Sequence, residues 1–271
     1  MKWIKSYNAS TQLLTLSTSY AISSFYFVKV IENTSVSLLL TLYGIPYKWS
    51  LLTIKYLTRS TTYWNEGNTL VIYGITELLL LGMGIWLLSY LFKQQQLSWR
   101  KRFFITWLAF ALINNAFSGI FTGSFVYDGF GYAFFWLLPS LLPRLTIAFL
   151  FFLLYIALSN FWSVLFLTTS YSSSLIQGRK NERKFLLIAL FIPLGLLALV
   201  VVLFNFPNFN KYETLQAFYP LVYLLPILIF LPEPGRIKLA SKGKLSVDVP
   251  VMLVLLTISV VALRLLNQIS I

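Results

Sequence analysis

The sequence predicts an all-α fold, a polytopic bundle of about six or seven transmembrane helices with one additional re-entrant or interfacial segment. The chain is 58% hydrophobic and only 11% charged, with a mean hydropathy of +0.77. Soluble domains are about 45–50% apolar and about 25% charged, so a water-soluble fold of this length could not cover its apolar surface. Apolar runs of about 20 residues, the length that crosses a bilayer, also recur along the chain. We therefore expect residues 1–271 to form one integral membrane domain.

Six predicted spans are residues 68–92, 103–124, 145–168, 185–204, 215–231 and 249–266. A seventh, over residues 12–31, is apolar but rich in Ser and Thr. After it, residues 34–57 contain Gly44 and Pro46 and allow two interpretations. They either enter the membrane a second time or lie on it as an amphipathic element. The first 60 residues therefore contain one crossing, two crossings, or one crossing and an interfacial helix.

Three basic segments orient the spans. Residues 93–102, 178–184 and 232–248 are rich in Lys and Arg, which favours the cytoplasmic side. An even number of predicted spans separates each of these segments from the next, so all three can lie on the same side of the membrane. We accordingly expect the N-terminus inside, the C-terminus outside, and the bacterial cytoplasmic membrane as the location. A single N-terminal crossing leaves Lys29, Lys48, Lys55 and Arg59 outside, against the same rule.

Residues 130–169 form one apolar stretch that is too long for a single straight helix. It lies between two basic segments and after one span, so it must contribute an odd number of crossings. Pro139 and Pro143 favour a break in the helix. We therefore expect residues 131–143 to be re-entrant or interfacial, followed by a span from about residue 145.

Composition excludes several functions. The chain has no Cys, hence no disulfide, thiol nucleophile or zinc–thiolate site, and no His, the commonest general base and haem ligand. No catalytic motif is present, so we expect a protein that is not an enzyme and that has no cofactor, no metal and no catalytic residue. The net charge of +13 lies in loops beside apolar runs, as anionic headgroups require. We expect the lipid bilayer and other membrane subunits as partners, and no nucleic acid.

Three ionisable residues fall inside or at the ends of predicted spans: Glu77, Arg144 and Arg264. Such groups are costly in lipid and usually mark a functional site. One interpretation is an outward-facing polar cavity in which Glu77 pairs with an arginine, Arg264 in preference to Arg144. In the other, both arginines extend to the headgroups and Glu77 bonds to a neighbouring helix. We favour the second interpretation for the arginines and a functional role for Glu77, because a short acidic side chain cannot easily reach water.

Small residues surround two of the candidate polar groups. Glu77 shares a helix face with Gly74 and Gly84, which would let another helix approach closely. The next span has a stripe at spacings of four: Ala111, Asn115, Gly119 and Gly123. Helix packing around the Asn115 amide is the favoured explanation, and a ligand site along the seam is the alternative. Asn114 should point elsewhere, about 100° around the helix.

The segment 127–132 is the last candidate. It has two glycines for a tight turn and several aromatic residues, which favours a turn at the membrane interface. In a functional role, Asp128 would be the carboxylate that faces a cation or substrate.

These features predict a transporter-like protein for a small solute, ion or lipid, which uses the region of Glu77. The alternative is a non-catalytic subunit or assembly factor of a larger membrane complex, for which short loops and the lack of motifs are natural. An enzyme acting on lipid is the weakest candidate, since no paired intramembrane carboxylates are evident.

Overall fold

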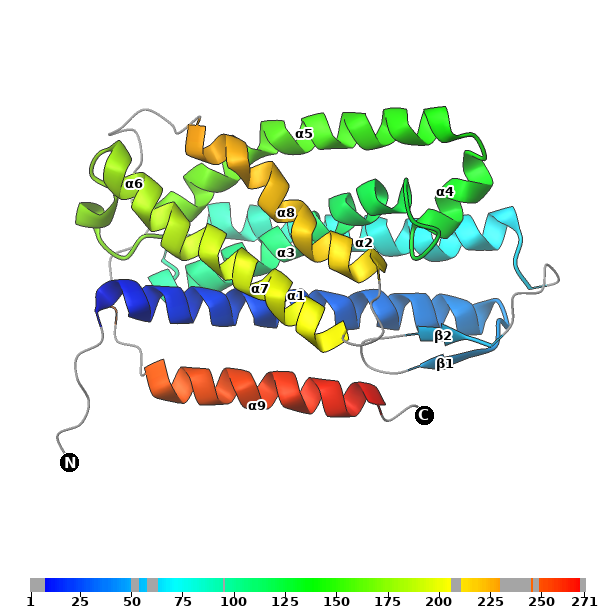
Figure 1. Ribbon diagram of the computed structural model, residues 1–271, viewed down its shortest axis with the longest axis horizontal. Helices are drawn as coiled ribbons and strands as arrows, with labels where there is room; N and C mark the ends of the chain where they lie inside the picture. The colour runs from blue at the N-terminus through cyan, green and yellow to red at the C-terminus, as the bar shows by residue number, and fades with distance from the viewer. Residues whose placement is uncertain are drawn as a thin grey trace.

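The computed structural model describes residues 8–49, 54–57, 63–94, 96–205, 211–229, 245 and 249–268, and their side chains except those of residues 222–229, 260 and 262–268. It confirms a helical bundle (Figure 1). Five helices are long and apolar enough to cross a membrane: α1 (Ala9–Leu42), α2 (Glu66–Lys93), α3 (Trp99–Gly123), α5 (Leu141–Thr168) and the continuous helix Arg179–Asn205. Large apolar side chains such as Leu78, Trp86 and Leu142 are exposed on their outer faces, as expected of lipid-facing surfaces.

Helix α1 is longer than the predicted span 12–31, because it continues through residues 34–42. Its many hydroxyls do not weaken it, since they bond to carbonyls one turn earlier, as Thr15 does to Thr11. The helix stops before Gly44, which has a φ of 65°. Strands β1 (Tyr47–Trp49) and β2 (Ile54–Tyr56) then pair antiparallel. The described part of residues 34–57 is therefore a helix end and a hairpin. No second membrane-length helix is found in the described part, and the interpretation of the segment as an amphipathic element on the membrane stays a prediction.

Helices α2 and α3 include the predicted spans 68–92 and 103–124 to within a residue. The side chain of Asn65 accepts a hydrogen bond from the backbone N of Asn68 and begins α2. At the other end, the guanidinium of Arg102 donates to the carbonyl of Leu91 at 3.2 Å, which ties the two helices together. Their close packing needs a small residue, because a β-carbon at Gly84 would lie 2.5 Å from the side chain of Ile113.

The predicted break in residues 130–169 is confirmed. Helix α4 (Gly131–Leu137) has only seven residues, and α5 begins separately at Leu141. The span starts earlier than the predicted residue 145, because Pro143 lies in its first turn, where a missing N–H is tolerated. The re-entrant or interfacial character of residues 131–143 stays a prediction.

The predicted span 185–204 also starts earlier, since α6 (Arg179–Leu186) leads directly into it after the short η1 (Ser173–Ile176). A π-helical turn, η2 (Leu187–Phe191), joins α6 to α7 (Ile192–Asn205). The turn precedes Pro193, which has no N–H to donate. Helices α8 (Lys211–Ile229) and α9 (Val249–Gln268) correspond to the predicted spans 215–231 and 249–266.

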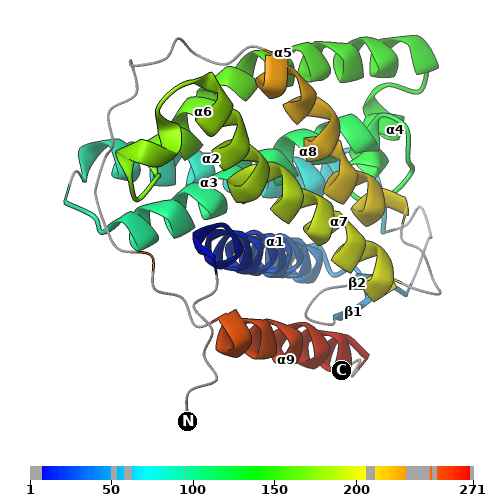
Figure 2. The same ribbon diagram turned by 60° about the vertical axis from the view of Figure 1, so that its left-hand side comes forward.

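Helix α3 is central and contacts α1, α2, α5 and α8. Figure 2 shows α1 nearly end-on, with α9 on one side and the rest of the bundle on the other. One half of the interior is an aromatic layer of edge-to-face rings: Phe103, Trp107, Phe110, Trp162 and Phe166. In this layer the indole N–H of Trp107 donates to Ser17 Oγ at 3.0 Å, and Ser17 donates to the Ala189 carbonyl at 2.6 Å.

Two of the basic segments lie at one end of the bundle. The ring of Trp99, at the start of α3, lies 5.5 Å from that of Tyr171, which follows α5. This contact brings the α2–α3 connection close to the segment that leads into α6, at the left of Figure 1. The third basic segment, residues 232–248, lies outside the described residues except for Leu245.

Candidate functional site

A group of buried polar side chains lies where α1, α2, α3 and α8 meet. We call it the polar cluster: Lys29, Glu32, Glu77, Asn115 and Gln216. The ammonium of Lys29 lies 2.7 Å from Glu32 Oε2 and donates to Gln216 Oε1 at 2.5 Å. Asn115 Nδ2 donates to the same Glu32 oxygen at 2.9 Å. An ion pair on α1 is thus held by amides from α3 and α8, with Lys29 only 4% exposed.

Glu77 completes the cluster from α2. It is 6% exposed, so the prediction that it faces the protein interior is confirmed. Its carboxyl group lies against Gly119, where a β-carbon would clash with Glu77 Oε1. The carboxyl group of Glu77 interacts electrostatically with the charges of Glu32 and Lys29. Its buried Oε2 atom accepts no hydrogen bond from the described residues, and the predicted bond of Glu77 to another helix stays a prediction.

Further polar side chains extend the cluster toward the end of the bundle that holds α4. Asn205 Nδ2 donates to Glu213 Oε2 at 3.1 Å, and the charge of Glu213 acts on Lys29. The Tyr212 hydroxyl accepts a hydrogen bond from the backbone N of Phe130 at 3.2 Å. It also lies close to Gly119, beside Glu77. The cluster is therefore continuous with the loop between α3 and α4.

Asp128 lies in this loop. Its Oδ1 atom accepts a hydrogen bond from the backbone N of Gly129 at 2.8 Å, and Gly129 has a φ of 53°. Burial raises the pKa of the Asp128 carboxyl, while the hydrogen bond from Gly129 and the charge of Lys29 lower it. The predicted turn is therefore present, and its carboxylate interacts electrostatically with the polar cluster.

The charge balance of this region is the reverse of that of the chain. Four of the eight acidic residues, Glu32, Glu77, Asp128 and Glu213, act on the single basic residue Lys29. Elsewhere basic residues dominate and give the net charge of +13. In the part of the chain that the structure describes, no three acidic side chains are arranged to share a metal ion.

Arg144 is not part of this site. Arg144 is buried, its guanidinium lies 3.6 Å from the ring centroid of Phe135, and its Nε donates to the Ser140 carbonyl at 3.3 Å. The expectation that it extends to the headgroups is wrong, because the ring and the carbonyl hold it between α4 and α5. No ion pair joins it to Glu77 among the described residues. The side chain of Arg264, the favoured partner, lies outside them.

Sequence reasoning missed Lys29, Glu32 and Glu213. The predicted first span stopped at residue 31, so Lys29 was placed at its outer end, whereas α1 continues for about three more turns. The signal was the Lys-x-x-Glu spacing of Lys29 and Glu32, which places opposite charges on one helix face. That spacing means little on an exposed helix, and only the length of α1 makes the pair internal.

Two amides beside the cluster have unpaired groups. Asn114 Oδ1 and Gln216 Nε2 are buried and make no hydrogen bond with any described residue. Both residues line a cavity of about 20 Å³ between α1, α3, α7 and α8, which is the size of a single water site. Asn114 was expected to point away from the seam, but it lines the same cavity as Asn115.

Comparisons with known protein families, with curated proteins and with solved structures give no match. The class of protein is therefore defined by its fold and composition, as a helical protein with five helices that can cross a membrane. Its function has to be argued from the polar cluster.

Proposed function

We propose that the protein is an ion transporter that carries protons across the membrane and that Glu77 is the residue that takes up and releases the proton. The observation behind this proposal is that Lys29, Glu32 and Glu77 lie buried or half-buried within long apolar helices, with Glu213 and Asp128 acting on Lys29 from one end, and that one Glu77 oxygen has no partner among the described residues. Ionisable residues within transmembrane helices are expensive, and they recur in proton relays and substrate pathways. A bundle held together by packing alone has no need of them.

A proton fits this site better than a metal ion. A metal ion needs several oxygen ligands in a fixed arrangement, and the described residues offer no three acidic groups placed to share one. A proton needs a single oxygen, which Glu77 Oε2 provides. The neighbouring Lys29–Glu32 pair is already held by Asn115 and Gln216, so Glu77 is free to change its charge.

The proposal includes a topology with seven crossings. They are α1, α2, α3, α5, the continuous α6–α7 helix, α8 and α9, with the basic segments on the cytoplasmic side of the cell membrane. The contact between Trp99 and Tyr171 supports a common side for two of these segments. The chain has no Cys, so a single cysteine at Lys180 can be tested in intact cells with an impermeant maleimide. Labelling without disruption of the cells would contradict the orientation.

Reconstitution into liposomes tests the transport function. Liposomes loaded with a pH-sensitive dye and given a pH gradient should acidify faster with the wild-type protein than without it. Glu77→Gln should reduce the rate to that of protein-free liposomes, because the amide cannot carry the proton. Glu66→Gln is the matched control, since Glu66 is exposed at the first turn of the same helix.

Equal rates for the wild-type protein and protein-free liposomes would contradict the proposal. In that case, a stoichiometric membrane partner that co-purifies in mild detergent would favour the alternative function, a non-catalytic subunit of a larger complex.

A further inference from the structure

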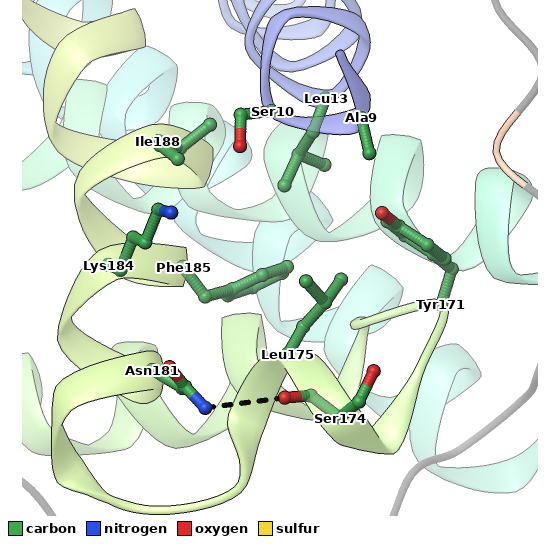
Figure 3. Close-up of a pocket in the computed structure, with 10 residues that line it drawn as sticks. All are labelled: Ala9, Ser10, Leu13, Tyr171, Ser174, Leu175, Asn181, Lys184, Phe185 and Ile188. Atoms are coloured by element: carbon green, nitrogen blue, oxygen red, sulfur yellow. Dashed lines mark hydrogen bonds between the residues drawn. The ribbon is translucent and has the colours of Figure 1, made fainter.

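A second cavity lies at the end of the bundle that holds the basic segments 93–102 and 178–184. None of the residues of the polar cluster lines it. It has a volume of about 110 Å³ and is formed by the start of α1, by η1 and by α6 with η2 (Figure 3). Its lining combines polar and apolar side chains: Ala9, Ser10, Leu13, Tyr171, Ser174, Leu175, Asn181, Lys184, Phe185 and Ile188. The mixture suggests an amphiphilic ligand rather than a wholly polar one.

The polar side of the cavity is suited to an anion. The ammonium of Lys184 lies on one side with the Ser10 hydroxyl, and the Tyr171 hydroxyl points toward the cavity from the other (Figure 3). Lys184 has no acidic partner among the described residues. A lysine ammonium with nearby hydroxyls recognises phosphate oxygens by charge and hydrogen bonding.

Contacts within the protein also fix the shape of the cavity before a ligand binds. Asn181 Nδ2 donates to the Gln177 carbonyl at 2.9 Å, which fixes the turn that leads from η1 into α6. The apolar side chains of Leu13 and Phe185 are buried and form part of the lining between the helices. An acyl or glycerol group could therefore rest on the apolar wall while a charged group faces Lys184.

The position of the cavity corresponds to the headgroup region of a membrane. It lies where two membrane-length helices begin, α1 and the continuous α6–α7 helix. Tyr171 packs against Trp99, and this pair of aromatic residues is typical of the membrane–water interface. The first turns of α6 add the exposed basic residues Arg179, Lys180 and Arg183, which attract anionic lipid.

We propose that this cavity binds the phosphate headgroup of an anionic phospholipid, with Lys184 as the charged contact and Ser10 and Tyr171 as hydrogen-bonding groups. The proposal does not depend on the function of the polar cluster. A phospholipid is favoured over free phosphate because the apolar wall, with Leu13 and Phe185, would have no role in binding an inorganic ion. The surrounding bilayer also supplies the lipid at high local concentration.

Native mass spectrometry of the full-length protein in neutral detergent can test this. Phosphatidylglycerol should bind in preference to phosphatidylcholine, and Lys184→Ala should weaken its binding about fivefold, which corresponds to about 1 kcal/mol. Lys180→Ala is the matched control, because Lys180 is an exposed lysine one turn earlier on α6 that does not line the cavity. It should leave most of the affinity unchanged. Inorganic phosphate should not displace the lipid.

Equal losses in the two lysine variants would overturn the proposal, since binding would then follow only the overall charge of α6. Displacement by inorganic phosphate would also overturn it and would identify a soluble anion as the ligand. Because Lys184 is exposed, Lys184→Ala should unfold at the wild-type temperature. If the two unfolding temperatures match, a loss of lipid binding results from the change at the cavity and not from unfolding.

Discussion

The aromatic layer and the polar cluster share helix α3, and α1 supplies hydrogen-bonding residues to both, yet the two regions differ in how they satisfy polar groups. In the aromatic layer, Trp107 donates a hydrogen bond to Ser17, and Ser17 donates one to the Ala189 carbonyl, so both donors have an acceptor. In the polar cluster, Glu77 Oε2 and Gln216 Nε2 have no hydrogen-bond partner among the described residues.

This difference indicates that the aromatic layer stabilises the bundle, whereas the polar cluster has a function beyond stability. Edge-to-face rings and closed hydrogen bonds stabilise a single arrangement of helices. Unpaired buried groups are costly to stability, and they persist where their chemistry is used. Substitutions in the aromatic layer should therefore affect stability alone, and substitutions in the polar cluster should affect both stability and proton transfer.

The largest effect should follow from removing the charge of Lys29. Lys29→Met leaves the half-buried Glu32 without its counter-ion, which should reduce the free energy of unfolding by about 3 kcal/mol. The double variant Lys29→Met/Glu32→Gln removes both charges and should recover much of this loss. Thermal unfolding in detergent measures both. If the double variant were no more stable than Lys29→Met, the ion pair would not be the stabilising interaction.

A smaller effect is expected at Gly119. A β-carbon there would clash with the Glu77 carboxyl and lie 3.1 Å from the Tyr212 hydroxyl. Gly119→Ala should therefore destabilise the protein by about 1–3 kcal/mol and displace Glu77. Gly195→Ala is the matched control in α7, because nothing lies within 4 Å of the new methyl group. Unfolding temperatures that fall equally in the two variants would show that Gly119 is not a specific contact of Glu77.

The smallest effect is expected in the aromatic layer. Trp107→Phe keeps a ring against Phe110 and Phe166 but removes the hydrogen bond to Ser17. The free energy of unfolding should fall by about 1 kcal/mol, and proton transfer in liposomes should remain at the wild-type rate. Loss of transport without loss of stability would contradict the separation of the two regions.

Apolar length and proline positions predicted most of the helices, because the bilayer itself sets both constraints. The break before α5 was predicted from Pro139 and Pro143, and the interior positions of Glu77 and Asn115 from helix faces. These features depend on local sequence, and each could be predicted without knowing which helices are neighbours.

The composition of the polar cluster could not be predicted in the same way. Gln216 meets Lys29 across 187 positions of the chain, and no local pattern indicates such a contact. Arg144 was misassigned for a related reason, since its contact with Phe135 depends on how α4 folds back toward α5. The pairing of Glu77 with Arg264 stays a prediction.

Infrared difference spectroscopy of the purified protein tests the central claim, that Glu77 takes up and releases a proton. Titration from alkaline to acidic buffer should produce the C=O stretching band of a buried carboxylic acid. The band should be present in the wild-type protein and in Glu66→Gln, and it should be weaker in Glu77→Gln, where other buried carboxyl groups such as that of Asp128 remain. A band that persists unchanged in Glu77→Gln, or a wild-type protein that shows none, would contradict the account.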